Sequence, residues 1–349
     1  MLFGKKSATI GLDIGSSQIK VVEVQRTGKG LTLLNYGIAP LLPEAIVEGE
    51  IMDRTLVIDT IRTLLDSRQI KNNNVISAVS GRGVIVKRIN MDKLKEQEAR
   101  ERIKWEAEQH VPFEISDVVL DFQIINPDLG NNQMEVLLVA ARNETVNAHL
   151  DLLSGAGLNP LLLDYGAFAV QNAFEANYDQ PADEILALVN IGADGTNINF
   201  IKNGVPYFTR DLPMASNSCL QLMQKNLGIS FEQASELIKG EPVSDVSQES
   251  ADSVFQSFAD DFASSIERTL SFLAMSGGGE RMSRIYMSGG GAMIPSLQDH
   301  LKERFGIPVE VINPLQKISY DPGLFGATSV EKISPVLTLA LGLGLREVK

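Results

Sequence analysis

The stretch that decides the fold is "IGLDIGSSQIKVVEV", residues 10–24. An apolar run ends at Ile14, small residues follow at 15–17, and a second apolar run begins at Ile19. This pattern predicts two strands joined by a tight turn. A hairpin needs only small residues at its tip, so the aspartate at position 13, at the end of the first strand, requires another explanation.

Length and composition limit the possible functions. The chain has 349 residues, 44% of them hydrophobic and 21% charged, which is enough for two domains or for one domain built as two halves. Its single cysteine, Cys219, rules out an intramolecular disulfide and is expected to be a packed side chain. The net charge of −13 argues against a nucleic-acid partner, because that affinity needs clustered Lys and Arg. Any bound anion must therefore be held by local groups.

The rest of the first half predicts an α/β arrangement with an insertion. A third strand follows Gly30, and a helix begins after Asp53, a suitable N-cap. The segment from 84 to 160 differs, because it predicts a strand, a polar helix over 92–110, a strand pair and a helix over 144–154. Such a segment is typical of a compact insertion with its own small sheet.

An internal repeat connects the two halves of the chain. The stretch "LALVNIGADGTNINFIKNGVPYFTRDLP", residues 186–213, has the same order of strand, polar residue, glycine turn, strand, turn and strand as the opening. Residues 190–194 align with residues 13–17. Helices are expected over 215–239 and 252–275, followed by a strand that ends in three glycines and, after a further helix and strand, by a final apolar helix.

The two turns suggest a phosphate site. A turn of glycine and serine allows successive backbone N–H groups to point at one spot, which makes a cradle for an anion, and two cradles could hold a polyphosphate from both sides. The candidate ligands in the first turn are Gly15, Ser16 and Ser17. Asp13 is expected to hold the Mg²⁺ that arrives with a nucleotide, and Lys20 to reach a phosphate oxygen. An ordinary hairpin with a solvated lysine is the alternative for a single copy of the motif.

A glycine-rich loop is the candidate site for the nucleoside. Gly289, Gly290 and Gly291 follow an apolar strand and precede a helix, so a base and a ribose could lie against bare backbone. Neither a Walker sequence nor the dinucleotide-binding glycine pattern occurs in the chain.

These motifs resemble the actin-like ATPase superfamily and, within it, the PilM family of type IV pilus assembly proteins, which is related to the division protein FtsA. The first phosphate motif matches at Asp13, at Lys20 and at the turn between them. The second phosphate motif, the adenosine motif and the closing helix match at "VNIGADGTNI" (residues 189–198), "YMSGGGAMIPSL" (286–297) and "LTLALGLGLRE" (337–347). The resemblance covers nearly the whole chain.

The resemblance implies a duplicated actin-like (ribonuclease H-like) α/β fold with an FtsA-like inserted small subdomain. The expected parts are the first-half core (1–83), the inserted subdomain (84–160), a connecting helix (161–185), the second half (186–334) with a helical subdomain at about 215–276, and a closing helix (335–349).

The resemblance also implies site residues for ATP and Mg²⁺. Asp164 would orient the attacking water, and Glu236 with Lys239 would hold the ribose. The phosphate ligands expected from the second motif are Gly192, Asp194, Gly195 and Thr196. Where the superfamily usually has an aspartate, this chain has Asn190, which offers a carbonyl oxygen to Mg²⁺ but no charge or base. Nucleotide binding with slow or absent hydrolysis is therefore expected.

The implied function is a cytoplasmic scaffold of type IV pilus assembly. Its expected partner is the N-terminal cytoplasmic tail of the membrane protein PilN, bound in the groove between the first half and the inserted subdomain. Membrane association would come only through that partner, and self-association is possible. A metabolite (sugar) kinase and an FtsA-like filament-forming protein are the alternative functions.

Overall fold

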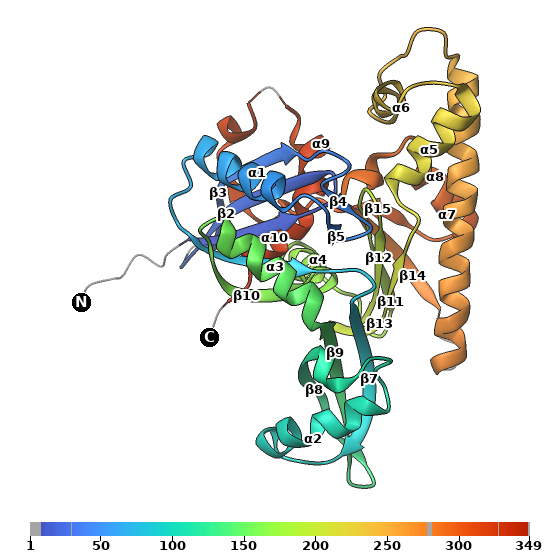
Figure 1. The fold of residues 1–349 in the computed structure, drawn as a ribbon. Helices are drawn as coiled ribbons and strands as arrows, with labels where there is room; N and C mark the ends of the chain where they lie inside the picture. Colours follow the sequence, from blue (N-terminus) through green and yellow to red (C-terminus); the bar gives the residue numbers. More distant parts are fainter. Residues whose placement is uncertain (1–7, 29, 278–280, 327, 348–349) are drawn as a thin grey trace.

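The computed structural model describes residues 8–28, 30–277, 281–326 and 328–347 (Figure 1). The ends of the predicted first half (1–7) and of the predicted closing segment (348–349) lie outside these residues. In strands, the elements are β1 (Thr9–Ile14), β2 (Gln18–Thr27), β3 (Gly30–Pro40), β4 (Ile46–Val47), β5 (Glu50–Ile51), β6 (Asn74–Val79), β7 (Val84–Asp92), β8 (Val118–Gly130), β9 (Gln133–Arg142), β10 (Asn159–Tyr165), β11 (Ile185–Ile191), β12 (Thr196–Lys202), β13 (Val205–Leu212), β14 (Met282–Ser288), β15 (Val309–Val311) and β16 (Ser319–Tyr320). The α-helices are α1 (Arg54–Ser67), α2 (Glu96–Glu108), α3 (Asn143–Gly155), α4 (Gly166–Asn177), α5 (Ser216–Leu227), α6 (Phe231–Ile238), α7 (Gln248–Gly277), α8 (Leu297–Phe305), α9 (Val330–Ile333) and α10 (Thr338–Gly344), and the short 3₁₀ turns are η1 (Ile115–Asp117), η2 (Gly290–Met293), η3 (Pro322–Phe325) and η4 (Ser334–Leu337).

The two large sheets repeat one topology. The first contains the order β3-β2-β1-β6-β10, and the second has the order β13-β12-β11-β14-β15. In each sheet the first three strands form an antiparallel meander, and the last two join it in parallel. The first sheet carries β16 as one further strand beside β3. The identical order confirms the duplicated α/β fold that the repeat predicts.

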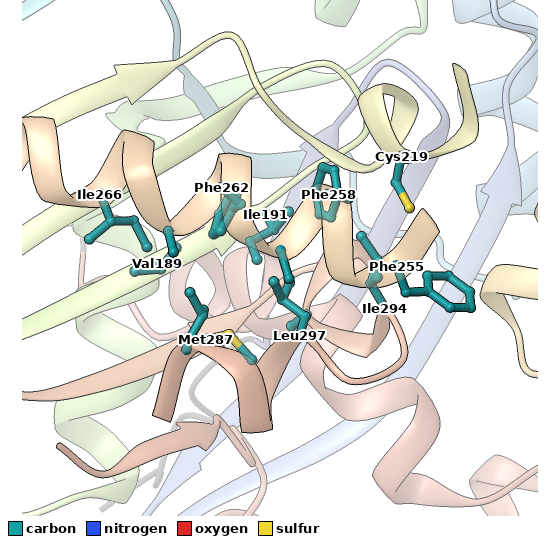
Figure 2. Packing of buried hydrophobic residues seen from close by; sticks show 14 of the residues in the cluster. Val189, Ile191, Cys219, Phe255, Phe258, Phe262, Ile266, Met287, Ile294 and Leu297 are labelled. Carbon is teal, nitrogen blue, oxygen red and sulfur yellow. The ribbon is translucent and has the colours of Figure 1, made fainter. Parts of the chain in front are cut away.

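Helices cover the outer face of each sheet. In the first half, α1 starts where the side chain of Asp53 accepts a hydrogen bond from the Leu56 amide, as predicted. In the second half, three phenylalanines at helical spacing on α7 (Phe255, Phe258 and Phe262) lie with Val189 and Met287 of the sheet in the largest cluster of buried apolar residues (Figure 2). Cys219 belongs to the same buried cluster, which confirms that it is a packed side chain.

Two helices lie between the inner faces of the two sheets and connect the halves. Helix α4 packs on the second sheet through Val170 and Phe174, and α10 packs on the first sheet and against α4. Their crossing is very close, because a Cβ atom on Gly342 of α10 would lie 1.6 Å from the carbonyl oxygen of Ala169 on α4. A Cβ on Gly11 of β1 would lie 2.1 Å from the Ala340 carbonyl of α10. Only glycine therefore allows these backbones to meet.

The inserted segment has a core of its own. Its sheet has the order β7-β9-β8, and α2 buries Ala99, Ile103 and Ala107 against it (Figure 1). Helix α3, in contrast, places Leu152 and Leu153 in the apolar cluster of the first half. The self-contained part of the insertion thus consists of β7, α2, β8 and β9.

Several predicted element boundaries were wrong. The helix predicted over 92–110 is shorter, because β7 continues to Asp92 in its pairing with β9. The helical stretch over 215–239 is divided into α5 and α6, because Gly228 adopts a left-handed conformation with φ of 67° and ends α5. Helix α7 begins before position 252, at Gln248. Among the described residues, no helix combines the length and the apolar composition needed to cross a bilayer.

Replacement of Gly342 by alanine tests the helix crossing. Alanine is the better helix former, yet its methyl group would overlap the α4 backbone, so we expect Gly342→Ala to lower the free energy of unfolding by about 1–3 kcal/mol. Urea denaturation followed by circular dichroism measures this loss. Gly28→Ala is the control, because no atom lies within 4 Å of the added Cβ. Equal stability of the two variants would contradict the close crossing.

Candidate functional site

Two turns of the same geometry occupy matching places in the two sheets. The pair Ile14 and Ile19 closes a four-residue loop between β1 and β2, and Ile191 and Thr196 close the loop between β11 and β12. In the first loop the Gly15 amide donates to the Gln18 carbonyl over 3.1 Å, and in the second the Gly192 amide donates to the Gly195 carbonyl over 2.9 Å. The two loops are therefore structural copies.

The middle of each loop offers unused backbone donors. Within the described residues, the amides of Ser16 and Ser17 donate to no protein acceptor, and the same holds for the amides of Ala193 and Asp194. Ser17 is exposed, and Ser16, Ala193 and Asp194 are partly exposed. Successive amides of this kind can bind an anion.

The strands that carry these loops turn corresponding faces toward the connecting helices. Gly11 faces α10, and Asp13 lies two residues further along the same strand, on the same face. Leu188 packs with α4, and Asn190 follows it two residues later. Asp13 and Asn190 thus stand at the ends of their strands on the inner faces of the two sheets, toward the layer that α4 and α10 form between the halves.

Asp13 is paired with the lysine that the motif places opposite it. The two residues face each other across β1 and β2, and the Lys20 Nζ donates to Asp13 Oδ2 over 3.0 Å. Their side chains are only 13% and 14% exposed. Gly15 lies beside the ammonium group, because a Cβ there would be 3.3 Å from Lys20 Nζ. The structure thus brings together the carboxylate, the ammonium group and the first glycine turn.

A buried histidine supports this strand end. The Ser77 hydroxyl donates to the Leu12 carbonyl over 2.7 Å, so its oxygen accepts from Nε2 of His149, 2.8 Å away. Burial lowers the pKa of His149 to about 4, although the charge of Asp13 acts in the opposite direction. His149 is therefore neutral at pH 7 and keeps the strand end in place without adding charge.

In the second sheet, Asn190 is bound to the glycine loop. Its Oδ1 accepts from the Ser288 hydroxyl over 3.1 Å. Gly289, at φ of 81°, lies so close that a Cβ would be 2.9 Å from this oxygen, and a Cβ on Gly291 would be 2.2 Å from Ile191 Cγ2. Of the three loop glycines, Gly290 alone has no atom within 4 Å of an added Cβ. The loop is therefore packed onto the end of β11 and open at its middle residue.

The second turn rests on the start of α5. The Ser216 amide donates to the Gly192 carbonyl over 3.1 Å, and the Asn217 side chain donates to the carboxylate of Asp194. Thr196 Oγ1 donates to the Met214 carbonyl over 2.7 Å. The Asp194 and Thr196 side chains thus hold the loop in shape, while the backbone of the loop remains available for a ligand.

Asp164 lies in the first sheet at the level of Asp13, with strand β6 between them. It is the next-to-last residue of β10, a strand that the sequence did not predict, and not the first residue of the helix. Its carboxylate is buried and forms an ion pair with Nε of Arg346 at 2.9 Å, beyond the end of α10. Burial raises the pKa of Asp164, and Arg346 acts against this rise. No hydrogen bond or ion pair within the described residues joins Asp164 to Asp13 or to either turn.

Glu236 and Lys239 stand apart from the strand ends. Both are exposed, Glu236 near the end of α6 and Lys239 at its C-cap. In the described part of the chain no ion pair joins them, and no hydrogen bond or ion pair connects them to the strand-end residues. Figure 1 shows α6 beside α5 and one end of α7, at the far end of the second half.

The sequence did not reveal three polar residues next to the site. Asn197 Nδ2 donates to the hydroxyl of Tyr165 over 2.9 Å and to Oδ1 of Asp211 over 2.8 Å. A signal exists for Asn197, because two asparagines alternate with apolar residues in "TNINF" at the start of β12. Tyr165 and Asp211 carry no such signal, since only the fold brings them together.

Duplicated sheets with paired strand-end turns and two connecting helices define the actin-like class of folds. Solved structures agree: the ethanolamine utilization protein EutJ from Carboxydothermus hydrogenoformans matches with a TM-score of 0.58 and 16% identity, over 97% of this chain and 89% of that one. MreB 5 of Spiroplasma citri bound to AMPPNP matches with a TM-score of 0.53 and 12% identity, over 97% and 95%.

Comparison with sequence families gives the particular family. Residues 11–348 match the type IV pilus assembly protein PilM, and the chain belongs to that family. A structure described as the PilM-PilN type IV pilus biogenesis complex matches with a TM-score of 0.86 and 28% identity, over 98% of both chains. The sequence resemblance to this family is thereby confirmed.

The low pKa of His149 predicts a specific loss of stability in acid. Between pH 6.5 and about 4 the unfolded chain binds a proton at His149 and the folded chain does not, so this residue lowers the free energy of unfolding by up to about 3 kcal/mol as the pH falls through that range. His149→Gln should lack this part of the pH dependence, which urea titrations at several pH values measure. Identical pH profiles for the two proteins would contradict the assignment.

Proposed function

We propose that this chain is an ATP-binding scaffold of type IV pilus assembly, with slow or absent hydrolysis, that docks the N-terminal cytoplasmic tail of PilN. The observation that carries the nucleotide part is the pair of matched turns with free amides at the ends of β1 and β11. Two such turns on the inner faces of two sheets suit a polyphosphate, which needs several donors arranged around it. In a chain with a net charge of −13, these local donors matter more than the overall field.

The residues present fit a magnesium nucleotide. Asp13 supplies a hard oxygen ligand, directly or through water, and Lys20 can exchange its carboxylate partner for a phosphate oxygen. Bound Mg²⁺ would neutralise part of the phosphate charge. The open backbone at Gly290 would accept the nucleoside. That MreB 5 was solved with AMPPNP on the same fold supports this assignment.

Two observations support slow or absent hydrolysis. Asn190 has no negative charge for the metal or for a water molecule, and its Oδ1 is already bound to Ser288. Asp164, the expected water-orienting residue, is held by Arg346. A closed state that breaks this ion pair would be needed before Asp164 could act on water.

The inserted subdomain offers a place for an extended peptide. Strand β8 is an edge strand of the order β7-β9-β8, so among the described residues one row of its backbone groups has no strand partner. Its start lies close to α3 of the first half, where the Asn143 side chain donates to the Ser116 carbonyl over 2.8 Å. Edge strands bind extended segments by strand addition. The match to a protein solved in a complex with PilN supports a PilN tail as the occupant.

Calorimetric titration tests the nucleotide site. We expect the wild type to bind ATP in the presence of Mg²⁺, and Asp13→Ala to weaken binding about tenfold or more, because a charge-assisted metal contact is lost. Asp66→Ala, an exposed aspartate on α1, is the matched control and should bind as the wild type does. Unchanged affinity of Asp13→Ala would refute the metal assignment.

A synthetic peptide tests the partner. A peptide with the N-terminal cytoplasmic sequence of PilN from the same organism should bind the full chain, and a peptide of the same composition in scrambled order should not. Fluorescence anisotropy of the labelled peptide measures both affinities. If the native peptide shows no more binding than the scrambled one, the scaffold function is wrong.

A further inference from the structure

A row of polar residues crosses the second sheet at the level of Asn190. The strand register places Ser288 of β14 beside Asn190 of β11, Asn190 opposite Asn197 of β12, and Asn197 opposite Asp211 of β13. Hydrogen bonds join Ser288 to Asn190 and Asn197 to Asp211. The row therefore extends from the glycine loop of the candidate nucleotide site to the edge of the sheet.

The outer end of this row contacts the first half at two points. Asn197 donates to the hydroxyl of Tyr165, the residue that directly precedes α4. Near the carboxylate of Asp211 lies the backbone amide of Gly81, three residues before β7 begins, which acts against the rise that burial causes in the pKa of Asp211. Tyr165 is 5% exposed, and Asn197 and Asp211 are partly buried, so these polar groups are only partly accessible to water.

Strands β7 and β13 continue this contact without pairing. They lie side by side but belong to different sheets, and each is the edge strand of its own. The guanidinium group of Arg88 on β7 lies 5.0 Å from the centre of the Tyr207 ring on β13. Two hydrogen bonds to Glu135, of 2.9 and 2.7 Å, fix the same guanidinium group to the inserted sheet. The inserted subdomain thus touches the second half directly.

A pocket borders this contact. It has a volume of about 290 Å³, is open to solvent, and is lined by residues 84–86, Tyr165 and residues 208–211. Close-packed interfaces resist displacement, whereas a contact that is held by polar groups and borders an open pocket can change at a small cost in packing. The contact is therefore suited to exist in two arrangements.

From this geometry we infer that β13 couples the nucleotide site to the inserted subdomain. A nucleotide that shifts Asn190 moves Asn197 through the pairing of β11 with β12 and moves Asp211 through its hydrogen bond with Asn197, and this changes the position of Gly81 and of β7. Asn197, Asp211 and Arg88 are positioning residues in this coupling and touch neither ligand. The inference rests on the proposed function, because it requires a Mg²⁺-nucleotide in the strand-end site and an extended tail on the inserted subdomain. By reciprocity, the tail must change nucleotide affinity by the same factor.

A binding cycle tests the coupling. The affinity of the full chain for the PilN tail peptide is measured with and without Mg²⁺ and the non-hydrolysable analogue AMPPNP. We expect the analogue to change peptide affinity about fivefold or more in the wild type. In Asn197→Ala and in Arg88→Met, the analogue should change peptide affinity by less than about twofold. Each ligand alone should still bind these variants within about threefold of its wild-type affinity.

The test includes a matched control and a second coupling variant. Lys87→Met removes one charge from the neighbouring, exposed position of β7 and should keep the wild-type ratio. Arg88→Met changes only a partly exposed contact, so it serves if Asn197→Ala fails to fold. The coupling alone would be overturned if the analogue changed peptide affinity as much in both coupling variants as in the wild type. It would also be overturned if both ligands bound the wild type and the analogue left peptide affinity unchanged. Failure of either ligand to bind by itself would overturn the proposed function, and the coupling with it.

Discussion

The close crossing of α4 and α10 is the contact on which the remaining structure depends. Gly342 brings α10 against the backbone of α4, and Gly11 brings β1 against the backbone of α10, at distances that leave no room for a side chain. The two sheets pack on this helix pair from opposite sides, so the crossing sets how the ends of β1 and β11 lie relative to each other. A site built from two strand ends of separate sheets requires such a rigid centre, because small displacements of its donors reduce ligand binding.

The sequence predicted well those parts whose causes are local. Residue type alone predicts the turn at 15–17 and the N-cap at Asp53. It also predicts the turn at Asn203 and Gly204, two residues that adopt positive φ. The repeat of the first meander at 186–213 was also visible, and it predicted the duplicated sheet order. The ion pair of Asp13 and Lys20 was not predicted, because the sequence analysis assigned the first to a metal ion and the second to a phosphate; the pair forms because the two residues stand opposite each other in one hairpin.

Other features escaped prediction because their causes are distant in the chain. The segment that forms β10, "NPLLLDYG", was predicted to begin a helix, because apolar and polar residues do not alternate in it. Parallel pairing with β6 makes it a strand. Asp164 pairs with Arg346, which lies 182 positions away by the difference of their numbers. The contact of Asn197 with Tyr165 and Asp211 likewise needs both halves in place. Residue type and spacing along the chain do not predict such contacts.

The central claim is that the two matched turns act together on one polyphosphate. Hydrogen–deuterium exchange with and without Mg²⁺ and AMPPNP tests this claim most directly, because the amides of Ser16, Ser17, Ala193 and Asp194 donate to no protein acceptor in the described structure. The account predicts that the nucleotide slows exchange in both loops, 15–18 and 192–195. Slower exchange in only one loop, or in neither while the nucleotide is bound, would contradict it.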